Sequence, residues 1–450
     1  MDLNKIYNVY FIGIGGIGMS ALARYFHANG KYVSGYDKTQ SAITNELEAS
    51  GIQVHFEDNI KKVDSDFLNV EETLIVYTPA IPKEHSELNY FNANGFQVLK
   101  RSQILGLITE NTFCLAVAGT HGKTTTTTIL GHLLNECGVP LTAFLGGISE
   151  NYNSNLILKG TKVTVVEADE FDRSFLTLKP DMACITSMDA DHLDIYGGHD
   201  ELNTSFKEFA KCLKPNGKLF IKSGLPIKGI TYGLEDASDY SIQNIKIENG
   251  TYVFDIKTPN AVLEDIYFNL PGRHNLSNAL IALAMAVEYG CPSLQLAKAL
   301  ASFKGVKRRF TYHIKTDNLV FIDDYAHHPE ELNAVNQAVR EMFPGKKVLA
   351  IFQPHLYSRT RDFIDEFAVS LSKFDSVLLL DIYPARELPI EGVSSSRLLE
   401  KVCIEDKELV SKKELISKIR ESNAQVVLTL GAGDIGEEVK HIKKEFSIAS

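Results

Sequence analysis

The sequence predicts an α/β protein of three domains, each built around a mainly parallel sheet. Apolar, strand-like runs alternate with helical patterns from one end of the chain to the other. A glycine-rich turn follows the first strand, and a second turn, which ends in Gly122, Lys123 and Thr124, follows a later strand. The length of 450 residues also suits about three domains.

Composition excludes several classes of partner. The formal net charge of −11 argues against nucleic acid or an anionic membrane as the main partner. The start of the chain leads directly into a strand and a turn, and no apolar run reaches membrane-spanning length. The six cysteines form no close pair of the metal or redox type. We therefore expect a soluble, cytoplasmic protein whose thiols are free.

Residues 1–106 are expected to form a Rossmann-like domain. A strand at 7–12 runs into a GxGxxG turn, and a second strand at 32–36 ends at Asp37. Such a turn binds a diphosphate, and Asp37 suits a ribose or sugar hydroxyl. At this point NAD and another nucleotide remain equally good interpretations. Further strands are expected at 74–78 and 96–99.

Residues 107–308 are expected to form a central P-loop ATPase-like domain. The strand at 113–118, the turn at 119–122 and the amphipathic helix after it have the order of a phosphate-binding loop. Lys123 would bridge the terminal phosphates of ATP, and the Thr124 hydroxyl would bind magnesium. A simple helix-capping turn is the alternative, which the correct flanking elements disfavour. The loop residues expected to contact ATP are Gly119, Thr120, His121, Gly122, Lys123, Thr124 and Thr125.

Two acidic clusters follow strands of this domain. The strand at 163–166 ends in Glu167 and is followed by Ala168, Asp169 and Glu170, and MDADHLDIYGG follows the strand at 181–186. Acids that only cap the next helix are the alternative. Because parallel strands present their carboxyl ends at one edge, we expect these groups to meet a metal-nucleotide there.

The rest of this domain carries two polar motifs. Residues 228–270 predict an antiparallel flank of strands, and the long helix after residue 271 can place His274, Asn275 and Asn278 on one face. GVKRRF follows at 305–310, where an arginine would neutralise phosphoryl charge.

Residues 309–450 repeat the strand and helix alternation as a C-terminal Rossmann-like domain. Its expected strands lead into the polar loops DDYAHHP, QPHLYSRT, DIYPARE and GAGD. Those strands are expected at 320–322, 348–352, 377–380 and 426–430.

With these motifs assembled, the sequence resembles the Mur ligase family, ATP-dependent amide-bond enzymes of bacterial cell-wall synthesis. The motifs that carry the resemblance occur in family order over essentially the whole chain, namely FIGIGGIGMS, AGTHGKTTTT, EADEFDRSF, DADHLDIYGG, GRHNLSNA, GVKRRF, DDYAHHP, FQPHLYSRTRD, DIYPARE and GAGDI. The shortened phosphate loop of that family also accounts for Val117, where the strict motif has glycine.

The resemblance implies a ligase that joins L-alanine to the lactyl carboxylate of UDP-N-acetylmuramate through an acyl phosphate, for peptidoglycan synthesis. It implies ATP as cosubstrate, two Mg²⁺ ions, and small-molecule partners only, in a monomer or weak homodimer. A related recycling ligase that adds a tripeptide is the nearest alternative. An NAD-dependent dehydrogenase and an ATP-driven binding protein are more distant ones, because they leave several motifs unexplained.

The resemblance also implies roles for individual residues. The first glycine turn would hold the diphosphate of a UDP-sugar. Glu167 would bind the ATP magnesium, His192 a second magnesium, and Arg309 the phosphoryl group. The UDP-sugar residues would be Gly13, Gly15, Gly16, Gly18 and Asp37; the adenosine residues Asn275, Asn278 and Asp324; and the amino-acid residues His327, His328, His355 and Arg359.

The sequence departs from the family pattern at two of these motifs. Leu356 stands where many relatives have arginine, so recognition of the alanine carboxylate would rest more heavily on Arg359. Ser187 replaces a common asparagine before the HLD motif. No residue is required to be a general base, and His328 is a candidate only.

Overall fold

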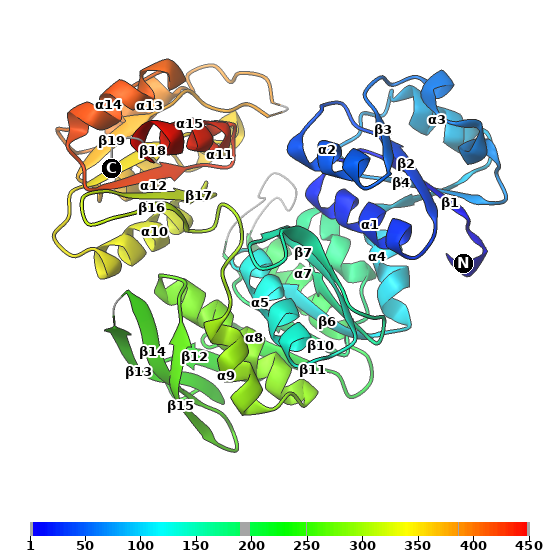
Figure 1. Ribbon diagram of the computed structural model, residues 1–450, viewed down its shortest axis with the longest axis horizontal. Helices are drawn as coiled ribbons and strands as arrows, with labels where there is room; N and C mark the ends of the chain where they lie inside the picture. Colours follow the sequence, from blue (N-terminus) through cyan, green and yellow to red (C-terminus); the bar gives the residue numbers. More distant parts are fainter. Residues whose placement is uncertain (1–2, 190–198, 249, 386, 448–450) are drawn as a thin grey trace. The chain divides into compact units, whose positions relative to one another are not determined.

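The computed structural model describes residues 3–189, 199–248, 250–385 and 387–447 (Figure 1). These residues form three β-sheets and divide into two compact units. The first unit contains Met1–Ile245, Phe254–Tyr267 and Ser277–Lys304, and the second contains Lys246–Val253, Phe268–Leu276 and Gly305–Ser450. Within the described ranges, none of the helices has the length and apolarity needed to cross a membrane.

The N-terminal sheet has the strand order β3-β2-β1-β4-β5, and all its pairings are parallel. Its elements are β1 (Asn8–Ile12), α1 (Ile17–Ala28), β2 (Tyr32–Tyr36), α2 (Ala42–Ala49), β3 (Gln53–His55), β4 (Thr73–Tyr77), α3 (Ser86–Ala93), β5 (Gln97–Lys100) and α4 (Arg101–Glu110), with the 3₁₀ turns η1 (Leu3–Lys5), η2 (Ile60–Lys62) and η3 (Ser65–Leu68). The Rossmann-like prediction is confirmed. The short edge strand β3 was not expected, because its three residues are all partly exposed and give no apolar run.

The second sheet has the order β15-β14-β13-β12-β11-β10-β6-β9-β7-β8. Its strands are β6 (Phe113–Ala118), β7 (Leu141–Ser149), β8 (Ser154–Leu158), β9 (Val163–Glu167), β10 (Met182–Ile185), β11 (Lys218–Lys222), β12 (Ile230–Leu234), β13 (Tyr240–Glu248), β14 (Thr251–Lys257) and β15 (Val262–Phe268). The associated helices are α5 (Lys123–Glu136), η4 (Phe171–Thr177), α7 (His199–Lys211), α8 (Arg273–Tyr289) and α9 (Ser293–Ala301). Strand β6 therefore lies between β9 and β10, so the phosphate loop, the acids after β9 and Asp189 after β10 leave one edge of the sheet.

The flank that follows β11 corrects one prediction. Strands β12 and β13 were expected to be antiparallel, but β12 pairs in parallel with β11 and β13 pairs in parallel with β12. Alternating strand patterns specify which side chains are buried and do not specify strand direction, so the sequence pattern could not distinguish the two arrangements.

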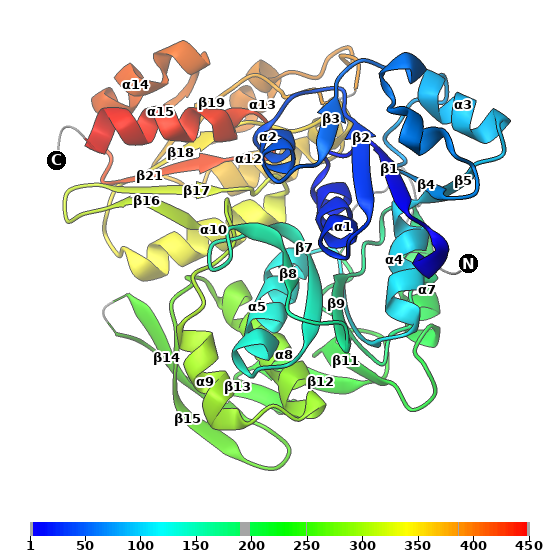
Figure 2. The ribbon, with the colours of Figure 1, turned by 45° about the vertical axis from the view of Figure 1, so that its right-hand side comes forward.

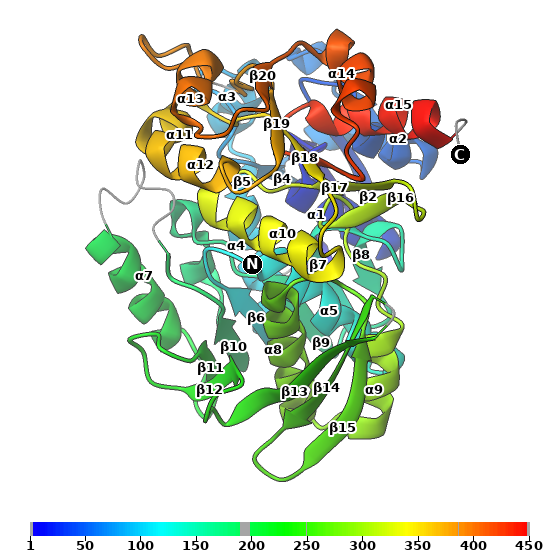
Figure 3. The same cartoon turned by 90° about the vertical axis from the view of Figure 1, so that its left-hand side faces the viewer.

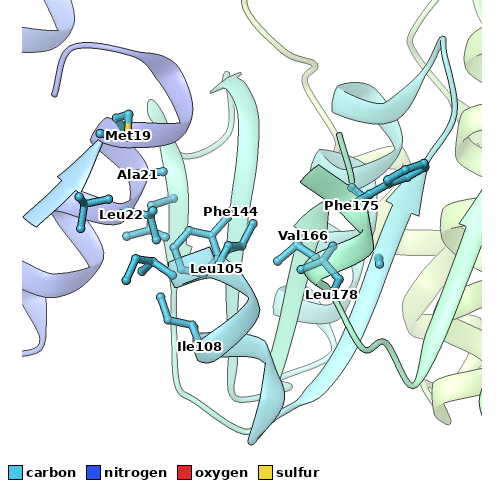
Figure 4. Close-up of a cluster of buried hydrophobic side chains, with 14 of the residues drawn as sticks. Met19, Ala21, Leu22, Leu105, Ile108, Phe144, Val166, Phe175 and Leu178 are labelled. Atoms are coloured by element: carbon cyan, nitrogen blue, oxygen red, sulfur yellow. The ribbon is translucent and has the colours of Figure 1, made fainter. Parts of the chain in front are cut away.

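A continuous hydrophobic cluster joins the first two sheets. Met19 and Leu22 on α1 pack with Leu105 on α4 and with Phe144 on β7, and the cluster continues to Val166 on β9 (Figure 4). A hydrogen bond from a buried amide also connects β8 to the start of α1, because Asn155 Nδ2 donates to the Ile17 carbonyl oxygen at 2.6 Å. These contacts hold the first glycine turn against the domain that carries the phosphate loop.

The third sheet has the order β16-β17-β21-β18-β19-β20, with β16 antiparallel to β17 and the remaining pairings parallel. Helices α10, α12 and α13 bury one face of it, and α14 and α15 bury the other, as Figures 2 and 3 show. The elements are β16 (Thr311–Lys315), β17 (Val320–Asp324), α10 (Pro329–Met342), β18 (Val348–Phe352), α11 (Tyr357–Asp362), α12 (Ile364–Leu371), β19 (Ser376–Leu379), α13 (Ser395–Lys401), β20 (Lys407–Leu409), η5 (Lys412–Glu414), α14 (Leu415–Ser422), β21 (Val426–Leu430) and α15 (Ile435–Ser447).

Candidate active site

The phosphate loop has the expected order of strand β6, turn and helix α5. Two glycines allow the turn. Gly119 has φ +132°, and Gly122 has φ +82°, where a non-glycine side chain would be strained. A Cβ atom on Gly119 would also lie 2.1 Å from Thr186 Oγ1. The backbone amides at the start of α5 are therefore positioned as an anion-binding turn.

Lys123 is held by a buried acid. Its Nζ lies 2.7 Å from Glu170 Oε2 and donates to the Gly119 carbonyl oxygen at 2.6 Å. Burial lowers the pKa of Lys123, but the carboxylates of Glu170, Asp169 and Glu167 together raise it by more, so its pKa lies above the usual value. The charged ammonium thus lies against the loop, where it could neutralise phosphate charge.

Thr124 and Glu167 form a pair of oxygen ligands. The Thr124 hydroxyl donates to both carboxylate oxygens of Glu167, at 3.0 and 3.2 Å. Gly146 on β7 leaves the room for this pair, because a Cβ atom there would lie 1.9 Å from Glu167 Oε2 and 2.8 Å from Thr124 Oγ1. A hydroxyl and a carboxylate at one point suit a hard ion such as Mg²⁺. The residues present fit the metal that the sequence predicts.

Residues at the end of β10 fix the loop from its other side. Ser187 Oγ accepts from the His121 backbone N–H at 2.8 Å and shares a hydrogen bond of 2.8 Å with Thr120 Oγ1. Thr186 Oγ1 donates to the His121 carbonyl oxygen. Ser187, whose role the sequence left undefined, thus supports the shape of the phosphate loop. Asp189 N–H donates to Thr120 Oγ1 in the same group.

Asn278, at the start of the long helix α8, also lies beside this loop. A Cβ atom on Gly122 would be 2.4 Å from Asn278 Oδ1. Its neighbour Asn275 belongs to the second compact unit, where its Nδ2 donates to the Pro271 carbonyl oxygen at 2.7 Å. His192 lies outside the described residues.

The first glycine turn is shaped by Asp37. The Gly15 backbone N–H donates to Asp37 Oδ2 at 2.8 Å, and the Thr39 N–H donates to Asp37 Oδ1 at 3.1 Å. Gly13 has φ +89°, and a Cβ atom there would lie 2.6 Å from Thr78 Cγ2. Asp37 therefore holds the turn in the conformation that presents its amides.

A cavity of about 270 Å³ extends from this turn to Glu167. Its walls include Gly16 and Gly18 of the turn, Glu167 and Asp169 after β9, and Arg101 at the start of α4. Apolar side chains complete it, namely Ile17, Met19, Ala21, Leu22, Leu105, Phe144 and Leu145. One ligand can therefore contact both the glycine turn and the carboxylate that is expected to bind metal.

In the second unit, Asp324 ends strand β17 as a buried acceptor. It accepts from the Phe310 and Ala326 backbone N–H groups, each at 2.7 Å. Burial raises the pKa of Asp324 to about 6. Its neighbour Arg309 lies 3.6 Å from Glu331 Oε1 and over the ring of Tyr325.

Arg308 and Arg309 have different surroundings. The Arg308 Nε donates to Asp323 Oδ2 at 3.0 Å, and its Nη2 donates to the Gly431 carbonyl oxygen at 2.7 Å. Arg308 thus ties the entry of this domain to β21. Of these two consecutive arginines, Arg309 is the better candidate for contact with a phosphoryl group.

His327 is partly buried, with 20% of its side chain exposed. Its Nδ1 lies 2.9 Å from the Tyr325 carbonyl oxygen, so Nδ1 carries the proton and Nε2 the lone pair. Burial lowers the pKa of His327 to about 4. His328 has a different place, because its Nδ1 accepts from the Glu330 N–H at the start of α10 and its ring packs on Phe363. The geometry makes His328 a helix cap.

His355 and Arg359 come together at the start of α11. The Arg359 Nη1 lies 3.4 Å from His355 Nδ1, and the His355 ring stacks on Tyr383. The rings of His327 and His355 have centroids 6.0 Å apart, so three of the predicted amino-acid residues form one cluster. Leu356 has φ +72°, a strained conformation for a non-glycine residue, which turns the chain into α11.

Sequence reasoning missed some members of these clusters. Gly146, Glu331 and Arg101 were not expected at the site, and Glu170 was recognised only as part of an acidic run. Glu331 had a signal, because it follows His327 by four residues at the start of a helix. The others depend on which strands become neighbours.

Models of protein families match the chain in three consecutive parts. Residues 8–112 match the Mur ligase family catalytic domain, residues 117–286 the Mur ligase middle domain, and residues 308–433 the Mur ligase glutamate ligase domain. Among solved structures, the UDP-N-acetylmuramate–alanine ligase of Thermotoga maritima is similar with a TM-score of 0.84 and 26% identity, over 98% of this chain and 100% of that one. A murein peptide ligase of Psychrobacter arcticus shares the fold, with a TM-score of 0.69, 21% identity and 98% of each chain covered.

Curated relatives are closer in sequence. The UDP-N-acetylmuramate–L-alanine ligase of Flavobacterium psychrophilum is 63% identical over 445 residues, which cover 99% of each chain. The enzyme of the same name from Parabacteroides distasonis is 49% identical over 453 residues, 99% of this chain and 98% of that one. The chain therefore belongs to the Mur ligase family of ATP-dependent, amide-bond-forming ligases.

Proposed function

We propose that the protein joins L-alanine to the lactyl carboxylate of UDP-N-acetylmuramate, with ATP converted to ADP and phosphate. The cavity carries this proposal, because one space is lined by both the first glycine turn and Glu167. A sugar nucleotide bound at the turn would thereby bring its carboxylate to the ATP site. The name and the 63% identity of the Flavobacterium relative support the same reaction.

The chemistry requires activation of the carboxylate, because hydroxide is a poor leaving group and an anionic carboxylate repels nucleophiles. The lactyl carboxylate attacks the γ-phosphorus of ATP, which forms an acyl phosphate and releases ADP. The neutral amine of L-alanine then attacks the acyl carbon, and phosphate leaves with the proton that the amine gives up. Catalysis of such a sequence is mainly positioning and charge neutralisation.

Lys123 and Arg309 supply positive charge for the phosphoryl transfer in this proposal. Thr124 and Glu167 would hold the Mg²⁺ that accompanies ATP, and His192 a second Mg²⁺. Bound Mg²⁺ would neutralise the charge that develops on the phosphoryl oxygens. Asn275, Asn278 and Asp324 would contact the adenosine part. Since Asn278 and Lys123 belong to one compact unit and Asn275, Arg309 and Asp324 to the other, nucleotide binding is expected to bring the units together.

The amino-acid site in this proposal is the cluster of His327, His355 and Arg359. The Arg359 guanidinium would bind the alanine carboxylate, and the neutral His327 ring can accept a hydrogen bond from the amine at Nε2. His328 would support the cluster as the cap of α10.

We assign three domains to these tasks. Residues 1–106 would bind the UDP-sugar through Gly13, Gly15, Gly16, Gly18 and the turn-holding Asp37. Residues 107–308 would bind ATP, and residues 309–450 the amino acid. We further propose that the protein acts in the cytoplasm, where ATP and nucleotide sugars are made, as a monomer or weak homodimer, with neither nucleic acid nor membrane as a partner.

Phosphate release tests the proposal. Purified protein with ATP, Mg²⁺ and UDP-N-acetylmuramate is assayed with L-alanine, glycine, L-serine or the recycled tripeptide, and NADH is offered separately. We expect release that requires both UDP-N-acetylmuramate and a small amino acid, fastest with L-alanine. Equal turnover with the tripeptide would assign the recycling reaction instead, and NADH oxidation without ATP would overturn the ligase assignment.

A further inference from the structure

Arg101 is a cation at the junction of the two substrate regions. It is the first residue of α4 and follows directly on β5. Strands β1, β4 and β5 are parallel neighbours, so Arg101 leaves the same edge of the sheet as the first glycine turn. No role for Arg101 was predicted from the sequence.

The Arg101 guanidinium lies against the first turn of α1. A Cβ atom on Gly18 would be 2.8 Å from Arg101 Nη1 and 3.1 Å from its Cδ. Glycine at position 18 is therefore what allows the arginine to approach the helix N-terminus so closely. The positive end of the α1 dipole and the guanidinium then act on the same point, which favours the binding of an anion there.

The Arg101 guanidinium also has N–H groups that can donate hydrogen bonds to a ligand. Within the described part of the chain its recorded polar partner is Asp169, whose Oδ2 lies 3.6 Å from Arg101 Nη2, beyond hydrogen-bond distance. Its side chain is three-quarters buried, with 25% exposed. A guanidinium has five N–H donors, and a partly buried one without hydrogen-bonded acceptors is expected to receive them from a ligand.

The cavity shows where such a ligand would lie. Of the described residues that line it, Arg101 is the one basic residue, and Glu167 and Asp169 are acidic. In a chain of net charge −11, binding of a dianion needs local positive charge. Glu167 faces the expected metal, which leaves Arg101 as the cation at the glycine turn.

We propose that Arg101 binds the diphosphate of the sugar nucleotide, together with the backbone amides of the glycine turn. The inference rests on the proposed function and adds the cation of the diphosphate subsite. Arg101 lies over Gly18, where a diphosphate on the α1 N-terminus would be, and its planar fork matches two phosphate oxygens. The salt bridge with Asp169 holds the guanidinium over the cavity before the nucleotide arrives.

Calorimetric titration of three variants tests this. Arg101→Ala, Arg101→Lys and, as a matched control, Arg24→Ala are titrated with UDP-N-acetylmuramate and with UDP. UDP contains the diphosphate but no lactyl carboxylate. Arg24 is a basic residue on α1 that pairs with Glu46 at 2.8 Å and does not line the cavity.

We expect Arg101→Ala to lower the affinity for both ligands by the same factor, about 10- to 100-fold, and to leave the affinity for Mg-ATP unchanged. Arg101→Lys should lose less affinity, because lysine keeps the positive charge but lacks the paired N–H donors of the planar guanidinium. Arg24→Ala should bind both ligands as the wild type does.

Three results would overturn the assignment. If Arg101→Ala weakens the binding of UDP-N-acetylmuramate but not of UDP, Arg101 contacts the lactyl carboxylate and not the diphosphate. If the binding of both ligands is unchanged, Arg101 has no role in ligand binding and only pairs with Asp169. Wild-type protein that binds UDP-N-acetylmuramate but not UDP would show that this site does not hold the diphosphate. Failure of the proposed function has a different signature, because it appears in the wild type as no phosphate release.

Discussion

Lys123 Nζ lies 2.7 Å from Glu170 Oε2, in a pair whose side chains are 12% and 0% exposed. The pair connects the phosphate loop to the acidic segment after β9, so the lysine that is expected to meet ATP also compensates a buried carboxylate. A buried carboxylate that loses its counter-charge lowers the stability of the folded protein.

Lys123→Ala should therefore reduce both activity and stability. We expect phosphate release to fall at least 100-fold and the free energy of unfolding to fall by about 3 kcal/mol. The double variant Lys123→Ala/Glu170→Gln removes the charge at both positions and should recover most of the stability while staying inactive. Activity assays and urea denaturation of both variants measure this. Equal stability of the single variant and the wild type would contradict it.

Gly146→Ala should impair the metal site without unfolding the protein. The new methyl group would overlap Glu167 Oε2 and crowd Thr124 Oγ1, so the two oxygens could not converge on one ion. We expect the affinity for Mg-ATP to fall at least tenfold, as measured by titration. Ala143→Gly, three residues earlier on the same strand, is the control and should keep Mg-ATP affinity. Normal Mg-ATP affinity in Gly146→Ala would show that the pair is not the ligand set.

The two proposed metal positions should separate in their effects. Glu167→Ala should weaken Mg-ATP binding as well as turnover, because it removes a ligand of the nucleotide's own metal. His192→Ala should reduce acyl-phosphate formation severely and leave Mg-ATP affinity little changed. Titration of Mg-ATP and trapping of the acyl phosphate compare the variants. An equal loss of nucleotide affinity in both would refute the assignment of two sites.

Arg359→Ala should raise the KM for L-alanine by about 10- to 100-fold while ATP binding stays near normal. The reason is that Leu356 offers no charge and Arg359 is the arginine that contacts His355. Arg361→Ala is the matched control, because Arg361 is half exposed and pairs with Asp362. Initial rates at varied alanine concentrations give both constants. If the two variants behave alike, the carboxylate is held elsewhere.

Glu87 predicts a pH dependence of stability. Its side chain is fully buried, and burial raises its pKa from 4.5 to about 7 although Tyr10 donates a hydrogen bond to it. The folded state thus binds this proton more tightly, so the contribution to stability is complete below pH 4.5 and is lost as pH rises through 7.

Glu87→Gln removes that titration. Between pH 4 and pH 8, the free energy of unfolding of the variant should rise relative to that of the wild type by at most about 3 kcal/mol. Urea midpoints at pH 4, 6 and 8 provide the measurement, with Glu46→Gln, at a partly exposed ion pair, as the control. Wild-type and Glu87→Gln midpoints that change in parallel with pH would show that Glu87 does not titrate in this range.

The local units of this protein could be predicted from its amino-acid sequence. The strand, turn and helix around Lys123 could be predicted because each depends on residues close together in the chain: an apolar run, two glycines and a helical repeat. Strands 32–36, 348–352 and 426–430 were predicted to the residue for the same reason. Family membership was also visible, because ten motifs recur in order.

Contacts between groups that are distant in the chain depend on the packing of the whole fold. Glu170 reaches Lys123 because β9 is the parallel neighbour of β6, and Ser187 reaches the loop because β10 is the neighbour on the other side. Gly146 and Arg101 reach the same cavity because an apolar core joins α1 and α4 to β7. Strand order is chosen by burial of whole faces over the entire chain. No local pattern contains it, which is why the motifs supplied Glu167 and Asp169 whereas Gly146 and Arg101 were found only in the fold.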